Sequence, residues 1–122
     1  MAFTRHDLLM AIIDDGTTEI PLAYPRPDQK NKREGAVAGF EACRDQDDQA
    51  LLTLLDAARG RTRQAMISGA ADYWWHRMFE AQVEWTLNVM SAALQAHGME
   101  PLIPPTARGM NKAMDILGVA AS

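Results

Sequence analysis

Hydrophobic positions recur with a helical period over residues 72–97, a stretch without glycine or proline that holds all 3 tryptophans of the chain. At about 100° per residue, Trp74, Met78, Gln82 and Trp85 fall on one side of the predicted helix. Trp75 and other apolar residues widen the apolar arc to roughly 200°, about twice the stripe of an ordinary surface helix. Such a helix needs cover from several directions, so we expect residues of about 70–97 to form the centre of the fold.

Shorter helices are predicted over residues 4–14, 28–44, 45–69 and 106–118, because apolar residues repeat there every three or four positions. Each begins at a residue that can accept hydrogen bonds from a helix N-terminus; the second ends near Arg44, and the other three and the long helix end at or near a glycine. The candidate N-caps are Thr4, Asp28, Asp45 or Asp47, and Thr106. The candidate stops are Gly16, Gly69, Gly98 and Gly118. Phe3 is placed to pack on Leu8 next to the Thr4 cap, with Asp7 at the third helical position.

Residues 17–27 contain three prolines, which interrupt a helix because proline lacks the backbone N–H donor. Within this segment Ile20, Leu22 and Tyr24 alternate with other residues, a period typical of extended chain. We therefore predict an extended, proline-rich arm over residues 17–27 whose apolar side lies against a helical surface.

Together these patterns predict an all-α fold: a compact helical bundle of four to five helices around the long helix of about 70–97, in a single domain over residues 1–122. No internal repeat or sustained heptad pattern is present. A helix of this length measures nearly 40 Å at about 1.5 Å per residue, more than a compact domain of this size covers. A second copy or another protein is expected to cover the excess.

Composition narrows the functional classes. The chain is 48% hydrophobic and 23% charged with a net charge of −4, which favours an ordered, soluble protein and disfavours binding to duplex nucleic acid or an anionic membrane. The first residues do not resemble a signal peptide, and no apolar run is long enough to span a membrane, so a cytoplasmic protein is expected. The single cysteine, Cys43, falls on an apolar helix face and is expected in the core.

One set of metal-capable residues stands out on the long helix. Asp72, His76, Glu80 and Glu84 follow one another four positions apart, so they form a ridge that could serve a metal-dependent helical enzyme. Metal sites inside helical bundles draw ligands from several helices, and the other helices carry no matching Glu or His on an apolar face. We therefore expect no metal or other cofactor and a solvated polar face, with Glu80 and Glu84 facing solvent or a polar partner and Arg77, Asn88 and Ser91 nearby.

Two clusters of cations are candidates for anion binding. The first cluster consists of Arg59, Arg61 and Arg63, and the second consists of residues 30–33. Both clusters adjoin acidic residues. Each therefore either binds an anion or forms local ion pairs at a solvated surface. Motifs of nucleophilic catalysis or phosphate binding are missing, and an enzymatic function is therefore not expected.

Three functions remain open. The first is a small, non-enzymatic accessory protein, of the kind encoded by bacteria or their phages, that binds another protein and forms a homodimer through residues 70–97. Its interface would use Trp74, Trp75, Met78, Gln82 and Trp85. Gln82 falls in the middle of the apolar arc and would pair across the dimer axis or within the chain, because a buried amide needs hydrogen-bond partners.

The second function is a helical binder of a small ligand or nucleotide. Tyr73, Trp74 and Trp75 would stack on a base, and Arg77 or Arg108 would contact a phosphate. The third is the metal-dependent enzyme that would use the ridge from Asp72 to Glu84. The sequence alone does not select among the three.

Overall fold

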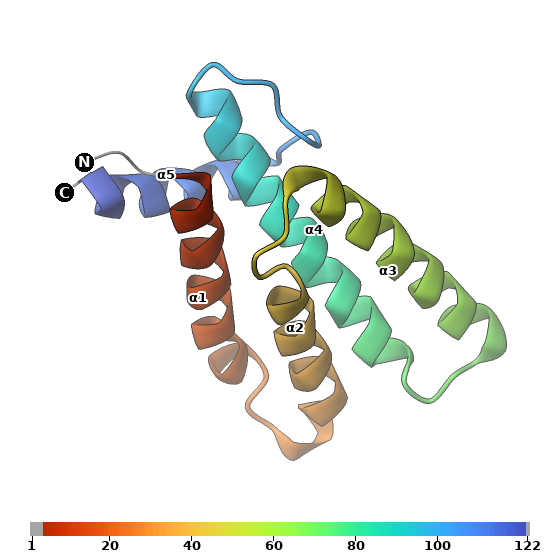
Figure 1. Ribbon diagram of the computed structural model, residues 1–122. Helices are drawn as coiled ribbons and strands as arrows, with labels where there is room; N and C mark the ends of the chain where they lie inside the picture. Colours follow the sequence, from red (N-terminus) through yellow and green to blue (C-terminus); the bar gives the residue numbers. More distant parts are fainter. Residues whose placement is uncertain (1–3, 122) are drawn as a thin grey trace.

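The computed structural model describes residues 4–121, and within them the chain forms five α-helices and one short 3₁₀ turn, with no strand (Figure 1). The helices are α1 (Arg5–Ala23), α2 (Lys30–Ala42), α3 (Asp48–Ser68), α4 (Tyr73–Ala96) and α5 (Ala107–Ala121), and the 3₁₀ turn η1 is Pro27–Gln29. The all-helical class expected from the sequence is confirmed. Helix α4 contacts each of the other four α-helices, and its bounds lie close to the predicted ones.

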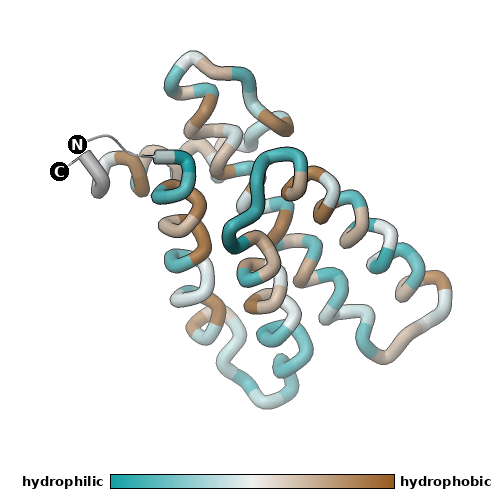
Figure 2. Tube along the Cα trace, viewed as in Figure 1, coloured by the Kyte–Doolittle hydropathy of each residue, from teal (hydrophilic) through white to brown (hydrophobic). Residues whose placement is uncertain are grey.

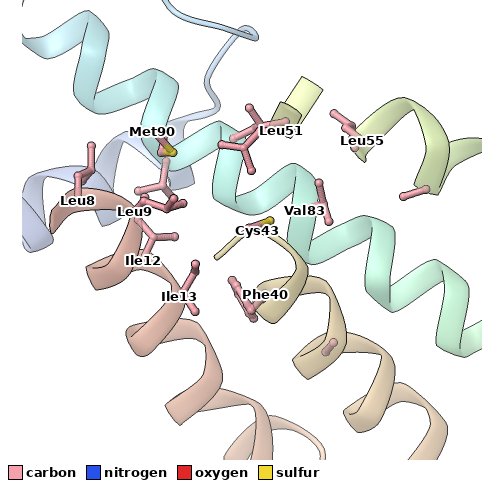
Figure 3. Packing of buried hydrophobic residues seen from close by; sticks show 14 of the residues in the cluster. Leu8, Leu9, Ile12, Ile13, Phe40, Cys43, Leu51, Leu55, Val83 and Met90 are labelled. Atoms are coloured by element: carbon pink, nitrogen blue, oxygen red, sulfur yellow. The ribbon is translucent and has the colours of Figure 1, made fainter. Parts of the chain in front are cut away.

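The C-terminal half of α4 is buried on every side. Each residue from 86 to 93 is buried, which requires neighbours all around the helix. The core that encloses it draws apolar side chains from α1, α2 and α3, among them Leu9, Phe40 and Leu51 (Figure 3). Fully burying a side chain of this size contributes about 1.5–3 kcal/mol relative to leaving it in water. The core therefore lies at this end of α4.

Helix α2 packs against α4 closely enough that two of its residues have no room for a side chain. A Cβ atom at Gly39 would lie 2.5 Å from the carbonyl oxygen of Phe79 and 3.1 Å from its Cα atom. At Gly35, one helical turn earlier, a Cβ would lie 2.8 Å from the Cα atom of Trp75. These contacts are with backbone, which cannot rotate away. The Gly35-x-x-x-Gly39 spacing therefore fixes the distance between α2 and the N-terminal half of α4.

The predicted arm over residues 17–27 is wrong, because α1 continues as a helix to Ala23 and includes Pro21. The apolar positions of this segment have a helical rather than an extended period: Ile20 is buried at 4% exposure, while Leu22 is 80% exposed. Only the short piece between α1 and η1 is non-helical, and Tyr24 forms the C-cap of α1.

Tertiary packing explains why neither Gly16 nor Pro21 ends the helix. Gly16 is buried, and a Cβ there would overlap the Phe40 ring, so the glycine makes room for an aromatic side chain of α2. Pro21 falls in the last turn of α1, where its missing N–H removes a single helical hydrogen bond. The hydroxyl groups of Thr17 and Thr18 donate to carbonyls one turn earlier, at 2.9 and 2.8 Å. Burying one face of the segment outweighs the local cost of the proline.

The predicted helix ends are confirmed where a side chain caps the backbone. Thr4 and Asp7 form a capping box, Asp47 accepts a hydrogen bond from the Ala50 N–H at 2.8 Å, and Thr106 accepts one from the Gly109 N–H at 3.1 Å. Gly69 ends α3 with a left-handed φ of 64°. The connection between α2 and α3, which contains Asp45 and Asp47, is hydrophilic (Figure 2).

Other predicted ends differ. Asp28 lies inside the turn η1, and the N-cap of α2 is Gln29. Gly118 does not end α5, which continues to Ala121. The expected contact of Phe3 with Leu8 lies outside the described residues.

Candidate docking cleft on helix α4

A cleft of about 860 Å³ lies between α1, the N-terminal half of α4 and α5. Its floor is one continuous face of α4, because the residues follow each other at helical spacing. The α4 residues that line it are Tyr73, Trp74, Arg77, Met78, Ala81, Gln82 and Trp85.

The walls of the cleft come from two other helices, and Phe40 of α2 also reaches it. The α1 wall consists of Gly16, Glu19, Ile20, Ala23 and the C-cap Tyr24. The α5 wall consists of Arg108, Asn111, Lys112 and Asp115. Apart from Arg108, the residues of both walls were not predicted from the sequence. The helical spacing of Gly16 and Ile20 was the available signal on α1, and the spacing from Arg108 to Asp115 was the signal on α5.

The cleft stays open because the other helices pack elsewhere on α4. Helix α2 approaches at Gly35 and Gly39, and α5 contacts the buried half of α4 through the side chain of Asn88. The face from Tyr73 to Trp85 consequently retains exposed aromatic surface: Trp74 is 50% exposed, and Trp85 is half-buried. This uncovered face corresponds to the excess apolar surface that the sequence predicts for the long helix.

The structure brings together most of the residues that the sequence singles out. Four of the five interface candidates line the cleft: Trp74, Met78, Gln82 and Trp85. All three ligand-binding candidates, Tyr73, Arg77 and Arg108, line it as well. The fifth interface candidate, Trp75, does not, because its ring stacks on Phe79 with ring centroids 5.4 Å apart.

Cations lie over the tryptophan rings of this region. The Arg108 guanidinium is 5.6 Å from the centroid of the Trp85 ring, and the Lys32 ammonium is 4.4 Å from that of Trp74. Each contact contributes about 0.5–1 kcal/mol when exposed and more when an occupant excludes water. The rings are thereby held in place at the surface of the cleft.

Arg77 has unused hydrogen-bonding capacity. Its Nη1 atom is buried without a hydrogen-bond partner among the described residues, and the Glu80 carboxylate lies 3.9 Å away. A buried donor without an acceptor costs about 1–3 kcal/mol. The Arg77 side chain as a whole is 42% exposed, so its other N–H groups can reach an acceptor on an occupant of the cleft.

Lys112, in contrast, is neutralised within the chain. Its Nζ atom lies 3.1 Å from Asp15 and 3.5 Å from Glu19, both on α1. Burial by itself would lower the pKa of Lys112, but the two carboxylates outweigh it and raise the pKa above its ordinary value. These pairs tie α5 to α1 across one end of the cleft.

The acidic ridge does not converge on one point. His76 lies 3.2 Å from Asp72, Glu80 lies 3.9 Å from Arg77, and Glu84 lies 3.7 Å from Arg59 on α3. Among residues 4–121 no three His, Cys, Asp or Glu side chains lie close enough to hold a metal ion. Asp72 and His76 thus pair with each other, whereas Glu80 and Glu84 each face an arginine.

The solvated polar face expected beside this ridge is wrong for Asn88 and Ser91, which are buried. The Asn88 amide donates to the Thr106 hydroxyl at 2.9 Å and accepts from the Thr106 N–H at 3.0 Å. Ser91 Oγ accepts from the N–H groups of Leu102 and Ile103, at 3.1 Å each. Both polar side chains fix the connection from α4 to α5, so their burial leaves no hydrogen bond unmade.

The two cation clusters take part in local contacts. In the first, Arg59 faces Glu84, and Arg61 lies 5.3 Å from the centroid of the Phe79 ring. In the second, Lys30 lies 3.8 Å from Glu34, and Arg33 donates to the carbonyl of Tyr24 at 2.8 Å. These contacts agree with the second alternative for the two clusters, in which they form local contacts at a solvated surface.

Comparisons with known protein families, with curated proteins and with solved structures find no match to this chain. Across the helices of the described region, none combines the length and the apolar character that a membrane crossing needs.

Proposed function

We propose that the protein is a small, non-enzymatic accessory protein that works by protein–protein interaction and forms a homodimer through the cleft face of α4. The observation that carries the proposal is the face from Tyr73 to Trp85, which the other helices of the described chain cover only in part, so that Trp74 remains 50% exposed. Its residue types are those that dominate binding energy at protein interfaces, where Trp, Tyr and Arg are the commonest hot spots.

The exposed surface of Trp74 gives the size of the hydrophobic contribution to the free energy of dimer formation. Half of its surface is exposed. A tryptophan buries about 200 Å² when fully covered, so a partner would remove about 100 Å² from water and gain about 2.5 kcal/mol. Covering the half-buried Trp85 and Tyr73 adds to this gain, and an acceptor for Arg77 adds a hydrogen bond.

The proposal is tested by replacing Trp74 with alanine and measuring self-association by sedimentation. We expect Trp74→Ala to keep its helical circular dichroism and to weaken the dimer by at least about 100-fold, because each dimer loses two such side chains at about 2.5 kcal/mol each. Ile67→Ala is the matched control, because Ile67 is a large exposed residue on α3, 71% exposed and away from the cleft. Equal association of wild type and Trp74→Ala would contradict the proposed interface.

A second candidate function is the binding of a small anionic ligand or nucleotide in the same cleft. The Arg77 side chain in the cleft lining and the Arg108 guanidinium above Trp85 favour it, because together they offer cations beside an aromatic ring. The cleft volume also falls within the range of roughly 300–1,000 Å³ that is usual for ligand sites. A thermal shift with nucleoside phosphates that is lost in Arg77→Gln would support this function in place of the dimer.

We also propose that the protein acts in the cytoplasm of a bacterium or in a phage-infected cell, which its small size and acidic composition favour. Fractionation of cells that express the tagged protein, with soluble and envelope markers, tests the compartment. Its presence in the envelope fraction would contradict the proposal.

A further inference from the structure

The cleft side of α5 carries two opposite charges that have no ion pair within the described residues: Arg108 and Asp115. Both side chains are exposed and both line the cleft. They are seven positions apart, which places them on the same side of the helix and about 10 Å apart along its axis.

The residues between these charges leave the middle of the wall without a free charge. Asn111 is uncharged, and Lys112 is already paired with Asp15 and Glu19. The wall thus presents a cation near the start of α5 and an anion about two turns later. Such a pattern is complementary to itself when it meets a copy that runs in the opposite direction.

Arg108 does not stabilise α5 by its position in the helix. Arg108 is in the first turn of the helix, where the macrodipole disfavours a positive side chain by about 0.3–1 kcal/mol. Its guanidinium is held over the Trp85 ring at the cleft. Both facts point to a role toward an occupant of the cleft.

We infer that this occupant is a second copy of the chain, docked about a two-fold axis that passes near Asn111 and Lys112. The two α5 helices then run antiparallel, and Arg108 of each copy pairs with Asp115 of the partner subunit. The inference rests on the proposed function and adds the register of the dimer, that is, which α5 residues of the two copies pair across the axis.

The charges of the cleft favour a second copy over the other occupants. A small anion would meet Asp115 and Glu19 as well as the cations, because these carboxylates line the same cleft. A partner of one dominant charge would satisfy either Arg108 or Asp115 and repel the other. A second copy satisfies both, and it does so twice across the axis.

Charge reversal tests this register. Arg108→Asp alone and Asp115→Arg alone each replace two attractive pairs by two repulsive ones, and we expect each to raise the dimer Kd by about 10- to 100-fold. The double variant Arg108→Asp/Asp115→Arg restores both pairs and should bind itself within about threefold of wild type. A mixture of the two single variants should form a heterodimer of the same affinity, since every pair is then attractive.

Controls separate this result from a general charge effect. Arg63→Asp reverses an exposed charge on α3, outside the cleft, and should leave the Kd unchanged within about threefold. Circular dichroism checks that each variant keeps its helices. Should a reversal fail to fold, the neutral variants Arg108→Gln and Asp115→Asn replace it, with an expected loss of about 3- to 10-fold each.

The outcomes distinguish the register from the proposed function. Rescue in both the double variant and the mixture supports the antiparallel pairing. A wild type that dimerises through Trp74 while neither combination restores binding overturns the register and leaves the proposed function standing. A wild type that remains monomeric overturns both.

Discussion

The close contact between α2 and α4 predicts a large effect of one added methyl group. Replacing Gly39 by alanine places a Cβ 2.5 Å from the Phe79 carbonyl oxygen, closer than real side chains approach a backbone atom. Because the obstacle is the backbone of α4, α2 must move away along the whole contact. Gly60 on α3 provides the matched control, since a Cβ there meets nothing within 4 Å.

The two substitutions should change stability in opposite directions. Alanine is preferred over glycine inside a helix by about 1 kcal/mol, a gain available at both positions. Overpacking a rigid contact costs about 1–3 kcal/mol, and at Gly39 the loss of contact along α2 adds to that cost. We therefore expect Gly39→Ala to lower the free energy of unfolding by about 1–3 kcal/mol and Gly60→Ala to raise it by about 0.5–1 kcal/mol.

Urea unfolding followed by circular dichroism measures both free energies, and thermal unfolding gives an independent value. The two variants should differ by roughly 10 °C in Tm, given several degrees per kcal/mol for a domain of this size. If Gly39→Ala is as stable as Gly60→Ala, then α2 does not approach α4 as described, and the geometry of the cleft on the neighbouring face of α4 is in doubt.

Three further predictions follow from buried or paired groups. Burial raises the pKa of the Cys43 thiol to about 11, so a thiol reagent at pH 8 should modify it only after unfolding. Because the pKa of Cys43 is raised in the folded state, its contribution to the free energy of unfolding is complete below its ordinary pKa of 9.0 and is lost as pH rises toward 11. A thiol that reacts with the reagent at once in the native protein would refute the burial of Cys43. Asn88→Ala removes both bonds to Thr106 and should cost about 1–3 kcal/mol in urea unfolding; an unchanged midpoint would show that the link is not formed. Glu80→Gln/Glu84→Gln should keep the fold and change stability by less than about 1 kcal/mol, and stoichiometric Fe, Mn or Zn that is lost in this double variant would contradict the non-metal assignment.

Local chemistry explains the parts of the fold that the sequence predicts well. The Thr4, Asp47 and Thr106 caps and the left-handed Gly69 depend on backbone groups a few residues away, so they can be inferred from neighbouring residues alone. The long helix is predicted for a similar reason, since its apolar period is unbroken over many turns.

Tertiary packing explains the errors. The proline-rich arm is a helix because Gly16 and Ile20 are buried, a gain that no local rule for proline includes. Asn88 and Ser91 look like surface residues in the sequence, yet they bond to the chain that crosses over them. In both cases the deciding partner lies elsewhere in the sequence.

The sequence predicted the α4 face of the candidate site and, beyond that helix, only Arg108. The face with Trp74, Met78 and Trp85 follows from the period of α4, whereas the walls on α1 and α5 depend on how helices are arranged in space. The Gly35-x-x-x-Gly39 spacing was readable as a close helix contact, but its partner helix was not.

Self-association through the cleft is the central claim, and sedimentation of the wild-type protein over a wide concentration range tests it most directly. We expect a monomer at low concentration that converts reversibly to a dimer as concentration rises, with the transition shifted upward by Trp74→Ala. A well-folded wild type that sediments as a monomer even at the highest concentration would contradict the account.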